Sequence, residues 1–298
     1  MSIARSILLR ASRSPWLADQ FRKRAFARRA VKRFMPGEDV ESALQASAAL
    51  ANDGLGTILT ALGERIETWE EAERVRDHYL SVLDRIAARK LPAEVSVKLT
   101  HLGLDVDRAR CLASVAALAE RSRDLGARLW IDMEESNYVD ATLALYRDAR
   151  AANENVGVCL QSYLYRTPRD IEALLPLGPS IRLVKGAYRE PAEIAYPKKS
   201  DNDAAYLALA RQLLDGGAFT VFGTHDMSLL GAIRKLGGAP FEVHMLYGIK
   251  MGEQKSLARE GVKVRTLISY GTHWFPWYMR RLAERPANVW FVVKNLFG

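Results

Sequence analysis

The chain has 298 residues, 49% hydrophobic and 26% charged, proportions that suit a soluble globular protein with one large α/β domain or two average ones. The segment before Glu38 holds ten basic residues and one acid, which gives it a net charge of +9. Because the formal net charge of the whole chain is +8, the remaining residues carry −1. Because that remainder is nearly neutral, its composition argues against a nucleic-acid-binding face.

Residues 1–40 are predicted to form a basic helical N-terminal arm, followed by a catalytic domain over residues 41–298. The arm is rich in Arg, contains Ser and Ala, and has few acids, which fits a helix packed on or beside the domain. The same composition is typical of a mitochondrial transit peptide, and the cations would also suit anionic lipid at about 1 kcal/mol each. The two cysteines form no CxxC pair and no apolar run reaches ~18 residues, so we expect a reducing compartment and no transmembrane helix.

Eight short apolar runs are predicted to be strands: Thr57–Thr60, Val95–Thr100, Leu129–Asp132, Val156–Gln161, Ile181–Lys185, Phe219–Gly223, Phe241–Leu246 and Val262–Ile268. Helical patterns follow them in alternation, over Thr68–Ala88, Val106–Leu125, Tyr138–Ala151, Thr167–Leu175, Asp201–Leu214, Met227–Leu236, Glu253–Arg259 and Trp274–Glu284. This alternation indicates parallel βαβ units, and eight of them predict an α/β protein with a closed (βα)8 TIM-like barrel. The stretch Tyr188–Ser200 is predicted to be a mobile loop at the rim.

Polar or charged side chains in four consecutive strands are expected to point into the barrel. In the second strand Val95 and Val97 share the apolar face, which leaves Lys98 on the other. The same alternation turns Asp132, Gln161 and Arg182 inward. A lone buried charge costs several kcal/mol, so Lys98, Asp132 and Arg182 must pair with each other or with a ligand. A structural salt-bridge network would explain any one of them, whereas four in phase favour a site at the C-terminal rim, where barrels carry chemistry.

Three further segments bear on ligands. Arg280 and Glu284 are four apart on a predicted helix and can pair, and with Arg281 they suit a carboxylate or phosphate; a solvated basic helix end is the alternative. Lys185–Tyr188 and the pair Thr224 and His225 follow strands, where they could approach a phosphate or form ordinary turns. No sequence motif suggests a metal site.

Several segments together resemble proline dehydrogenase of the stand-alone bacterial type. They are VSVKL at 95–99, IDMEES at 131–136, QSYLY at 161–165, RLVKGAY at 182–188, GTHD at 223–226 and YGTHWFPWYMRRLAER at 270–285. The likeness extends from about Arg33 to the C-terminus, and its motifs occur in the family's order. Gly223 departs from the pattern, since the family often has Ala there.

The resemblance implies an FAD-dependent enzyme that oxidises L-proline to 1-pyrroline-5-carboxylate. The catalytic residues would be Asp132, which orients Lys98, and Arg182, which lies near flavin N5. The positions that match the family's substrate pocket are Lys98, Tyr188, Leu246, Tyr270, Arg280, Arg281 and Glu284. Those that match its flavin site are Met133, Gln161, Arg182, Lys185, Gly186, Ala187, Thr224 and His225.

The resemblance also implies a quinone as electron acceptor. We therefore expect a cytoplasmic protein with peripheral contact at the inner face of the cell membrane, or a mitochondrial one in a eukaryotic source. Two alternatives stay open: a barrel lyase or aldolase that forms a Schiff base at Lys98 or Lys185, and a scaffold that binds a membrane or a partner through its basic arm. The sequence does not indicate the oligomeric state.

Overall fold

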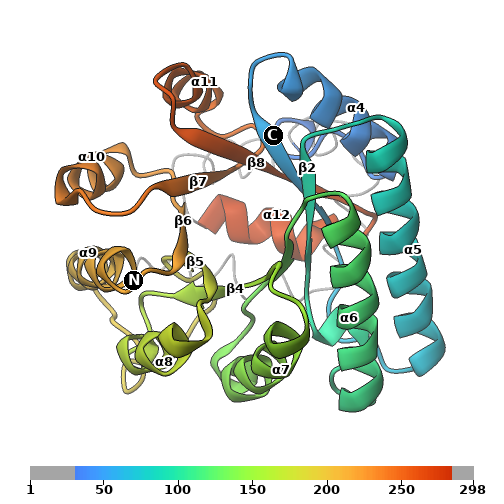
Figure 1. Cartoon of the computed structure of the whole chain (residues 1–298), viewed down its shortest axis with the longest axis horizontal. Helices are drawn as coiled ribbons and strands as arrows, with labels where there is room; N and C mark the ends of the chain where they lie inside the picture. The colour runs from blue at the N-terminus through green and yellow to red at the C-terminus, as the bar shows by residue number, and fades with distance from the viewer. Residues whose placement is uncertain (1–30, 284–298) are drawn as a thin grey trace, which may run out of the picture.

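Eight parallel strands form a closed barrel in which each strand pairs with the next and β8 returns to β1 (Figure 1). The computed structural model describes residues 31–283, and of Pro276 and residues 280–283 only the backbone. The strands are β1 Gly56–Ala61, β2 Ala93–Val97, β3 Leu129–Ile131, β4 Val156–Gln161, β5 Ser180–Val184, β6 Phe219–Gly223, β7 Phe241–Leu246 and β8 Lys263–Tyr270. The predicted (βα)8 barrel is confirmed.

Helices surround the barrel on its outer side, apart from α12, which crosses one end of the barrel (Figure 1). They are α4 Val40–Ala51, α5 Trp69–Ala88, α6 Arg108–Asp124, α7 Val139–Ala152, α8 Thr167–Leu174, α9 Lys199–Asp215, α10 Met227–Leu236, α11 Met251–Arg259 and α12 Trp274–Ala283, with short 3-10 turns η1 Thr100–Leu102, η2 Ser136–Tyr138 and η3 Leu175–Leu177. Capping side chains define several starts: Thr68 accepts from the Glu71 amide at 3.3 Å, and Asp107 from the Arg110 amide at 3.0 Å.

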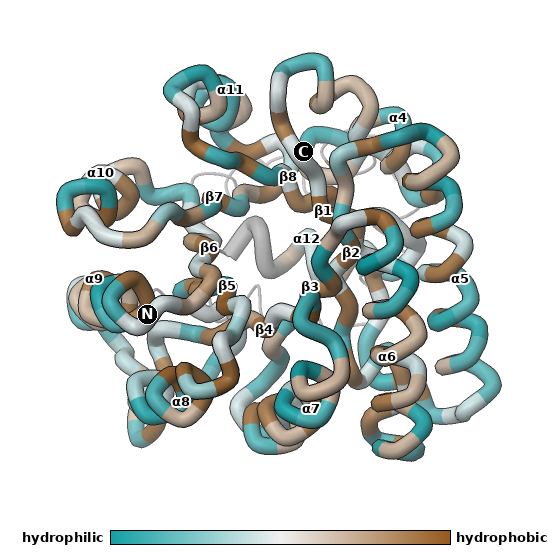
Figure 2. Tube along the Cα trace, viewed as in Figure 1, coloured by the Kyte–Doolittle hydropathy of each residue, from teal (hydrophilic) through white to brown (hydrophobic). Residues whose placement is uncertain are grey.

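Side chains alternate along the strands between an outer and an inner core, as predicted. Val95, Val97 and Leu129 are fully buried in the large core between strands and helices, whereas Trp130 belongs to a small separate cluster with Ile58. Hydrophilic residues follow the outer side of α5 (Figure 2). The strand period of two therefore sets which side chains face the barrel axis.

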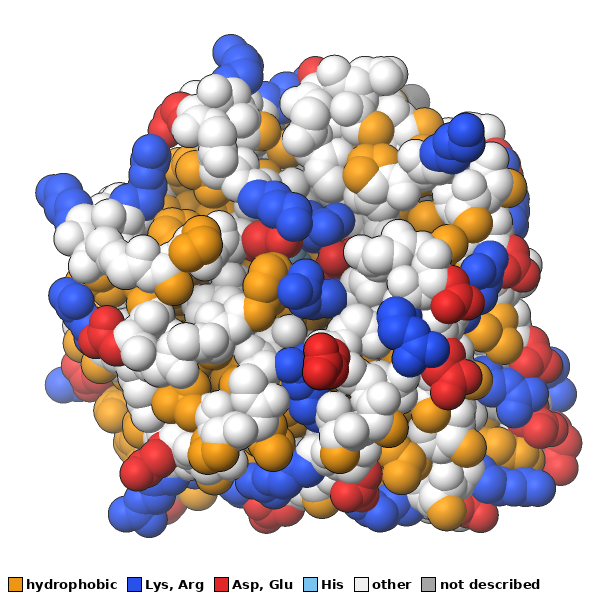
Figure 3. Space-filling view, viewed as in Figure 1, with side chains coloured by type: hydrophobic (Ala, Val, Ile, Leu, Met, Phe, Trp, Pro, Cys, Tyr) orange, Lys and Arg blue, Asp and Glu red, His pale blue; other side chains and the backbone are white. Residues whose placement is uncertain are grey.

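The barrel face opposite α12 is closed by paired charges. Arg265 contacts Glu94 and Glu242, each at 3.0 Å, and Lys263 contacts Glu242 at 2.6 Å. Arg128 stacks over the Phe219 ring at 3.4 Å. Figure 3 shows acidic and basic side chains gathered over the centre of this face. Ligand access is therefore expected at the other end of the barrel.

Helix α4 packs against β1 and β8 and so belongs with the barrel. The predicted arm lies largely outside the described residues, which leaves the arm and its boundary at residue 40 a prediction. Within residues 31–283, no helix combines the length and apolar content that a membrane span requires.

Candidate active site

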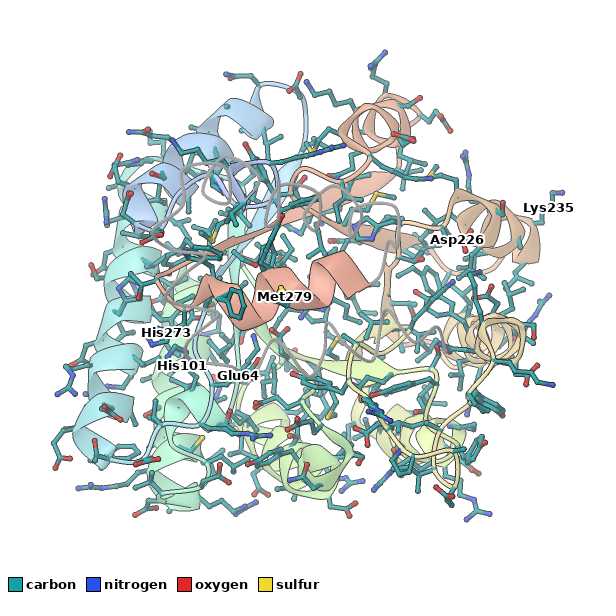
Figure 4. All side chains as sticks on the ribbon, turned by 180° about the vertical axis from the view of Figure 1, so that it is seen from behind. Glu64, His101, Asp226, Lys235, His273 and Met279 are labelled. Atoms are coloured by element: carbon teal, nitrogen blue, oxygen red, sulfur yellow. The ribbon has the colours of Figure 1, made fainter. Side chains whose placement is uncertain are left out.

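A cavity of about 890 Å³ opens at the C-terminal ends of the strands. Helix α12 crosses the barrel on this side, as the view from behind shows (Figure 4), and its Trp277 lines the cavity. Most of the predicted site residues line it as well: Lys98, Asp132, Met133, Gln161, Arg182, Lys185, Gly186, Ala187, Tyr188, Thr224, His225 and Leu246. The structure thus brings together side chains from six loops and strands.

Asp132 is the centre of a charged group on the cavity wall. It follows β3 directly and accepts from Lys98 Nζ at 3.3 Å through Oδ2, while its Oδ1 accepts from Ser96 Oγ at 2.7 Å and from the Arg182 guanidinium. The Lys98, Asp132 and Arg182 side chains are only 13%, 18% and 3% exposed. The predicted pairing of these inward charges is therefore observed.

The pairing fixes the charge state of this group. Burial alone would raise the pKa of Asp132, but Lys98 and Arg182 outweigh it and lower that pKa below its ordinary value. Burial would likewise lower the pKa of Lys98, and the Asp132 carboxylate overcomes this and raises it. All three groups are thus charged at neutral pH.

A layer beneath these charges holds Arg182 in place. Its Nε lies 3.5 Å from Cys159 Sγ, and its guanidinium lies 5.1 Å from the centroid of the Trp130 ring. Trp130 is fixed by a 2.7 Å hydrogen bond from Nε1 to Glu94. A side chain at Gly157 would lie 2.6 Å from the indole, so glycine there leaves room for Trp130. Arg182 is therefore rigidly positioned.

Gln161 and Glu134 are linked beside this layer. Gln161 Nε2 donates to the Glu134 carbonyl at 3.2 Å, while its Oε1 is buried without a hydrogen-bond partner among the described residues. The Glu134 carboxylate accepts from Thr100 Oγ1 at 2.6 Å, and burial raises its pKa. Sequence reasoning did not single out Glu134, although it lies within the IDMEES motif.

Lys185 is paired with acids that the sequence did not indicate. Its Nζ lies 2.5 Å from Asp203 and 3.2 Å from Asp226, and Lys199 contacts the same two carboxylates. Asp226 also caps α10 by accepting from the Leu229 amide at 3.2 Å. Burial alone would raise the pKa of Asp226, but this bond and Lys185 lower it to about 2. This part of the wall is nearly neutral overall.

The backbone after β5 is close to the cavity and tightly held. Gly186 has a φ of +104°, and a Cβ there would lie 2.4 Å from the Tyr163 ring, so only glycine fits. The following stretch was predicted to be mobile. In the structure the Tyr196 amide donates to the Tyr163 carbonyl at 2.8 Å and the Tyr165 amide to the Ile194 carbonyl at 3.0 Å, and the mobility of the stretch stays a prediction.

Of the predicted substrate residues, one lies away from the cavity and three have side chains outside the described part of the structure. Tyr270 does not line the cavity, because β8 continues to this residue and the alternation along the strand turns Leu267 and Ser269 inward. The Tyr270 hydroxyl instead forms a hydrogen bond of 2.9 Å with His78 Nε2. The backbones of Arg280 and Arg281 lie in α12, but their side chains are outside the described atoms. Glu284 lies outside the described residues.

No group of three or more His, Cys, Asp or Glu side chains within residues 31–283 is arranged to hold a metal ion. Sequence reasoning also missed Trp277 and His244, both of which line the cavity. The signal for His244 was present, because Glu242, His244 and Leu246 alternate with apolar residues along β7.

Solved structures share this fold. Proline utilization A (PutA) from Bdellovibrio bacteriovorus, inactivated by N-propargylglycine, matches with a TM-score of 0.79 and 22% identity over 86% of this chain. A PutA mutant from Bradyrhizobium japonicum, D779W, matches with a TM-score of 0.72 and 23% identity over 86% of the chain. This chain spans about a third of both proteins, 32% and 31% of their length, so the likeness concerns the barrel alone.

Sequence relatives extend the match to nearly the whole chain. Proline dehydrogenase 1 of Bacillus subtilis strain 168 is 36% identical over 283 residues, which cover 93% of this chain and 94% of the relative. Proline dehydrogenase of Deinococcus radiodurans is 37% identical over 276 residues, 89% of each protein. A family model described as proline dehydrogenase matches residues 43–294. The chain therefore belongs to the proline dehydrogenase family.

Proposed function

We propose that this protein oxidises L-proline to 1-pyrroline-5-carboxylate with FAD as cofactor, by hydride transfer to flavin N5, and passes the electrons to a membrane quinone as the first step of proline catabolism. Family membership supports proline as the substrate. The observation that carries the proposal further is the joined group of Lys98, Asp132 and Arg182 on the wall of one large cavity.

The cavity suits a flavin. Its volume of about 890 Å³ is within the range of cofactor sites. Gln161 Oε1 and Arg182 Nη1 are buried without hydrogen-bond partners in the described part of the chain. A buried acceptor and a buried donor at one cavity suit the carbonyl and N–H groups of a flavin ring, because an unpaired buried polar atom costs about 1–3 kcal/mol. Bound FAD would supply the hydride acceptor.

The chain's own residues would hold the substrate and the developing charge. Lys98, kept protonated by Asp132, would bind the proline carboxylate together with Arg280 and Arg281 of α12. Such a clamp contributes by fixing the distance and angle of the reacting carbon. Arg182 would place a permanent cation where negative charge accumulates as the hydride is transferred.

The quinone acceptor implies contact with a membrane. We place the protein in the cytoplasm with peripheral contact at the inner face of the cell membrane, or in the mitochondrion of a eukaryotic source. The basic residues before Glu38 would supply that contact. This placement would be supported if the full chain sedimented with anionic vesicles but not with neutral ones.

A Schiff-base lyase is disfavoured by the state of Lys98. A lysine nucleophile must be neutral, whereas Asp132 at 3.3 Å raises the pKa of Lys98 despite its burial. Lys185 forms ion pairs with Asp203 and Asp226. Borohydride added with a small keto acid or aldehyde, the kind of substrate a Schiff-base enzyme needs, should therefore leave both lysines unmodified.

One spectroscopic experiment tests the proposal. The purified protein should show flavin absorbance bands that bleach when L-proline is added without oxygen. A colourless protein that remains colourless with added FAD would refute the cofactor. A flavin spectrum that proline does not change would keep the cofactor and refute the substrate.

A further inference from the structure

His244 is a buried polar side chain at the cavity that the proposed reaction does not use. It lies in β7, one inward position below Leu246, and lines the cavity although its side chain is only 2% exposed. Its Nδ1 has no hydrogen-bond partner within the described residues, whereas its Nε2 lies 3.5 Å from Glu242 Oε2. A buried nitrogen without a partner costs free energy that a bound ligand would recover.

The imidazole ring is held in place by its neighbours. It stands edge-on to Trp130, with ring centroids 5.4 Å apart and an interplanar angle of 84°. The Arg182 guanidinium lies over the same indole, with its Cζ 5.1 Å from the ring centroid. Trp130 is itself fixed by Glu94 at 2.7 Å. Trp130 therefore forms one rigid platform against which both Arg182 and His244 pack beside the cavity.

The charges around His244 define which nitrogen is available. Nε2 lies 3.5 Å from Glu242 Oε2, too far for a strong hydrogen bond but close enough for the carboxylate to favour a proton on Nε2. Burial lowers the pKa of His244 to about 3, although the hydrogen bond to Glu242 opposes this shift, and nearby Arg182 adds to the lowering. The ring is therefore neutral at physiological pH, with a lone pair on Nδ1.

We propose that His244 is a further cofactor-binding residue, whose Nδ1 accepts a hydrogen bond from an N–H or O–H donor of the bound flavin. The inference rests on FAD being the cofactor. The donor would be the ring N–H or a hydroxyl of the ribityl chain, both of which a flavin carries. His244 would thus complement the donor Arg182 Nη1 with an acceptor on the same platform.

The test is a titration of flavin-free protein with FAD, followed by the change in flavin fluorescence. His244→Phe keeps an aromatic ring against Trp130 but removes both nitrogens, and should raise the FAD Kd about tenfold, the effect of one buried hydrogen bond. His244→Gln keeps an acceptor and a donor and should restore the Kd to within about twofold of wild type. Thr142→Val is the matched control and should leave the Kd unchanged, because it removes a hydroxyl of α7 that is buried away from the cavity and has no hydrogen-bond partner among residues 31–283.

The outcomes separate this inference from the proposed function. A wild-type protein that binds no FAD would overturn both. Wild-type FAD affinity in His244→Phe would overturn the role of His244 alone; if that variant does not fold, His244→Leu decides in the same way. Equal loss in the Phe and Gln variants would point to packing and also overturn the inference. Lumiflavin, which lacks the ribityl chain, identifies the donor: an equal loss of its affinity assigns the ring N–H, and no loss assigns a hydroxyl.

Discussion

Replacing Asp132 by Asn should destabilise the protein strongly, because this carboxylate neutralises two buried cations. The Asn side chain would keep the hydrogen bond with Ser96 but leave Lys98 and Arg182 without a counter-charge. With exposures of 13% for Lys98 and 3% for Arg182, water would screen these charges poorly. Removing one member of a buried ion pair costs about 3–5 kcal/mol, which for a protein of this size corresponds to a fall in Tm of roughly 6–20 °C.

Thermal unfolding at neutral pH, followed by circular dichroism, measures this effect. Asp148→Asn is the matched control, because Asp148 pairs with Arg108 on the surface, where both side chains are about half exposed. Its loss should cost less than about 1 kcal/mol. Adding Lys98→Met to Asp132→Asn should recover part of the lost stability, with a coupling of about 0.5–3 kcal/mol. If Asp132→Asn and Asp148→Asn lowered the Tm equally, the argument from buried charge would be refuted.

Three further outcomes follow from the structure and the proposed function. Tyr270→Phe removes the hydroxyl that bonds His78, so the free energy of unfolding in urea titrations should fall by about 1 kcal/mol. The KM for proline should stay the same, and a large rise in KM would instead show that Tyr270 contacts the substrate. Arg281→Ala should raise the KM for proline with unchanged FAD content, and equal loss of FAD would contradict a role limited to the substrate. Burial alone would raise the pKa of Glu242, but its contacts with His244 and Arg265 lower it from 4.5 to about 2, so Glu242 stabilises the fold above about pH 4.5 and this stabilisation is lost as the pH falls toward 2. The urea midpoint of Glu242→Gln should accordingly fall less over that range than the wild-type midpoint.

The barrel could be predicted because strand alternation and helix period are local properties of the sequence. Predicted and observed strands agree closely, as in Phe241–Leu246 and Phe219–Gly223. The inward phase of Lys98 and Asp132 follows from the same alternation, so their pairing was also predictable. What failed was a boundary: the eighth strand was expected to end at Ile268, and its continuation to Tyr270 places that side chain on the outer face.

Pairings across the barrel could not be predicted, because they depend on where distant segments meet. Asp203 lies in α9 and Asp226 at the start of α10, yet both contact Lys185 after β5. In the sequence Lys185 therefore resembles a free phosphate-binding cation. The structure shows that its charge is already balanced, so backbone N–H groups and the other lysines at this end would have to contribute more to holding a pyrophosphate.

The charge balance on the opposite wall suggests why the site would select an anionic substrate. Two cations, Lys98 and Arg182, contact the single carboxylate of Asp132, while Glu64 and Glu134 also act on Lys98, so direct contacts balance the positive charge in this poorly hydrated place only in part. Holding an uncompensated buried charge costs several kcal/mol, and a bound carboxylate offsets that cost. The same residual charge would stabilise the negative charge that builds up during hydride transfer. Cations whose charge is balanced only in part would thus serve both substrate binding and the chemical step.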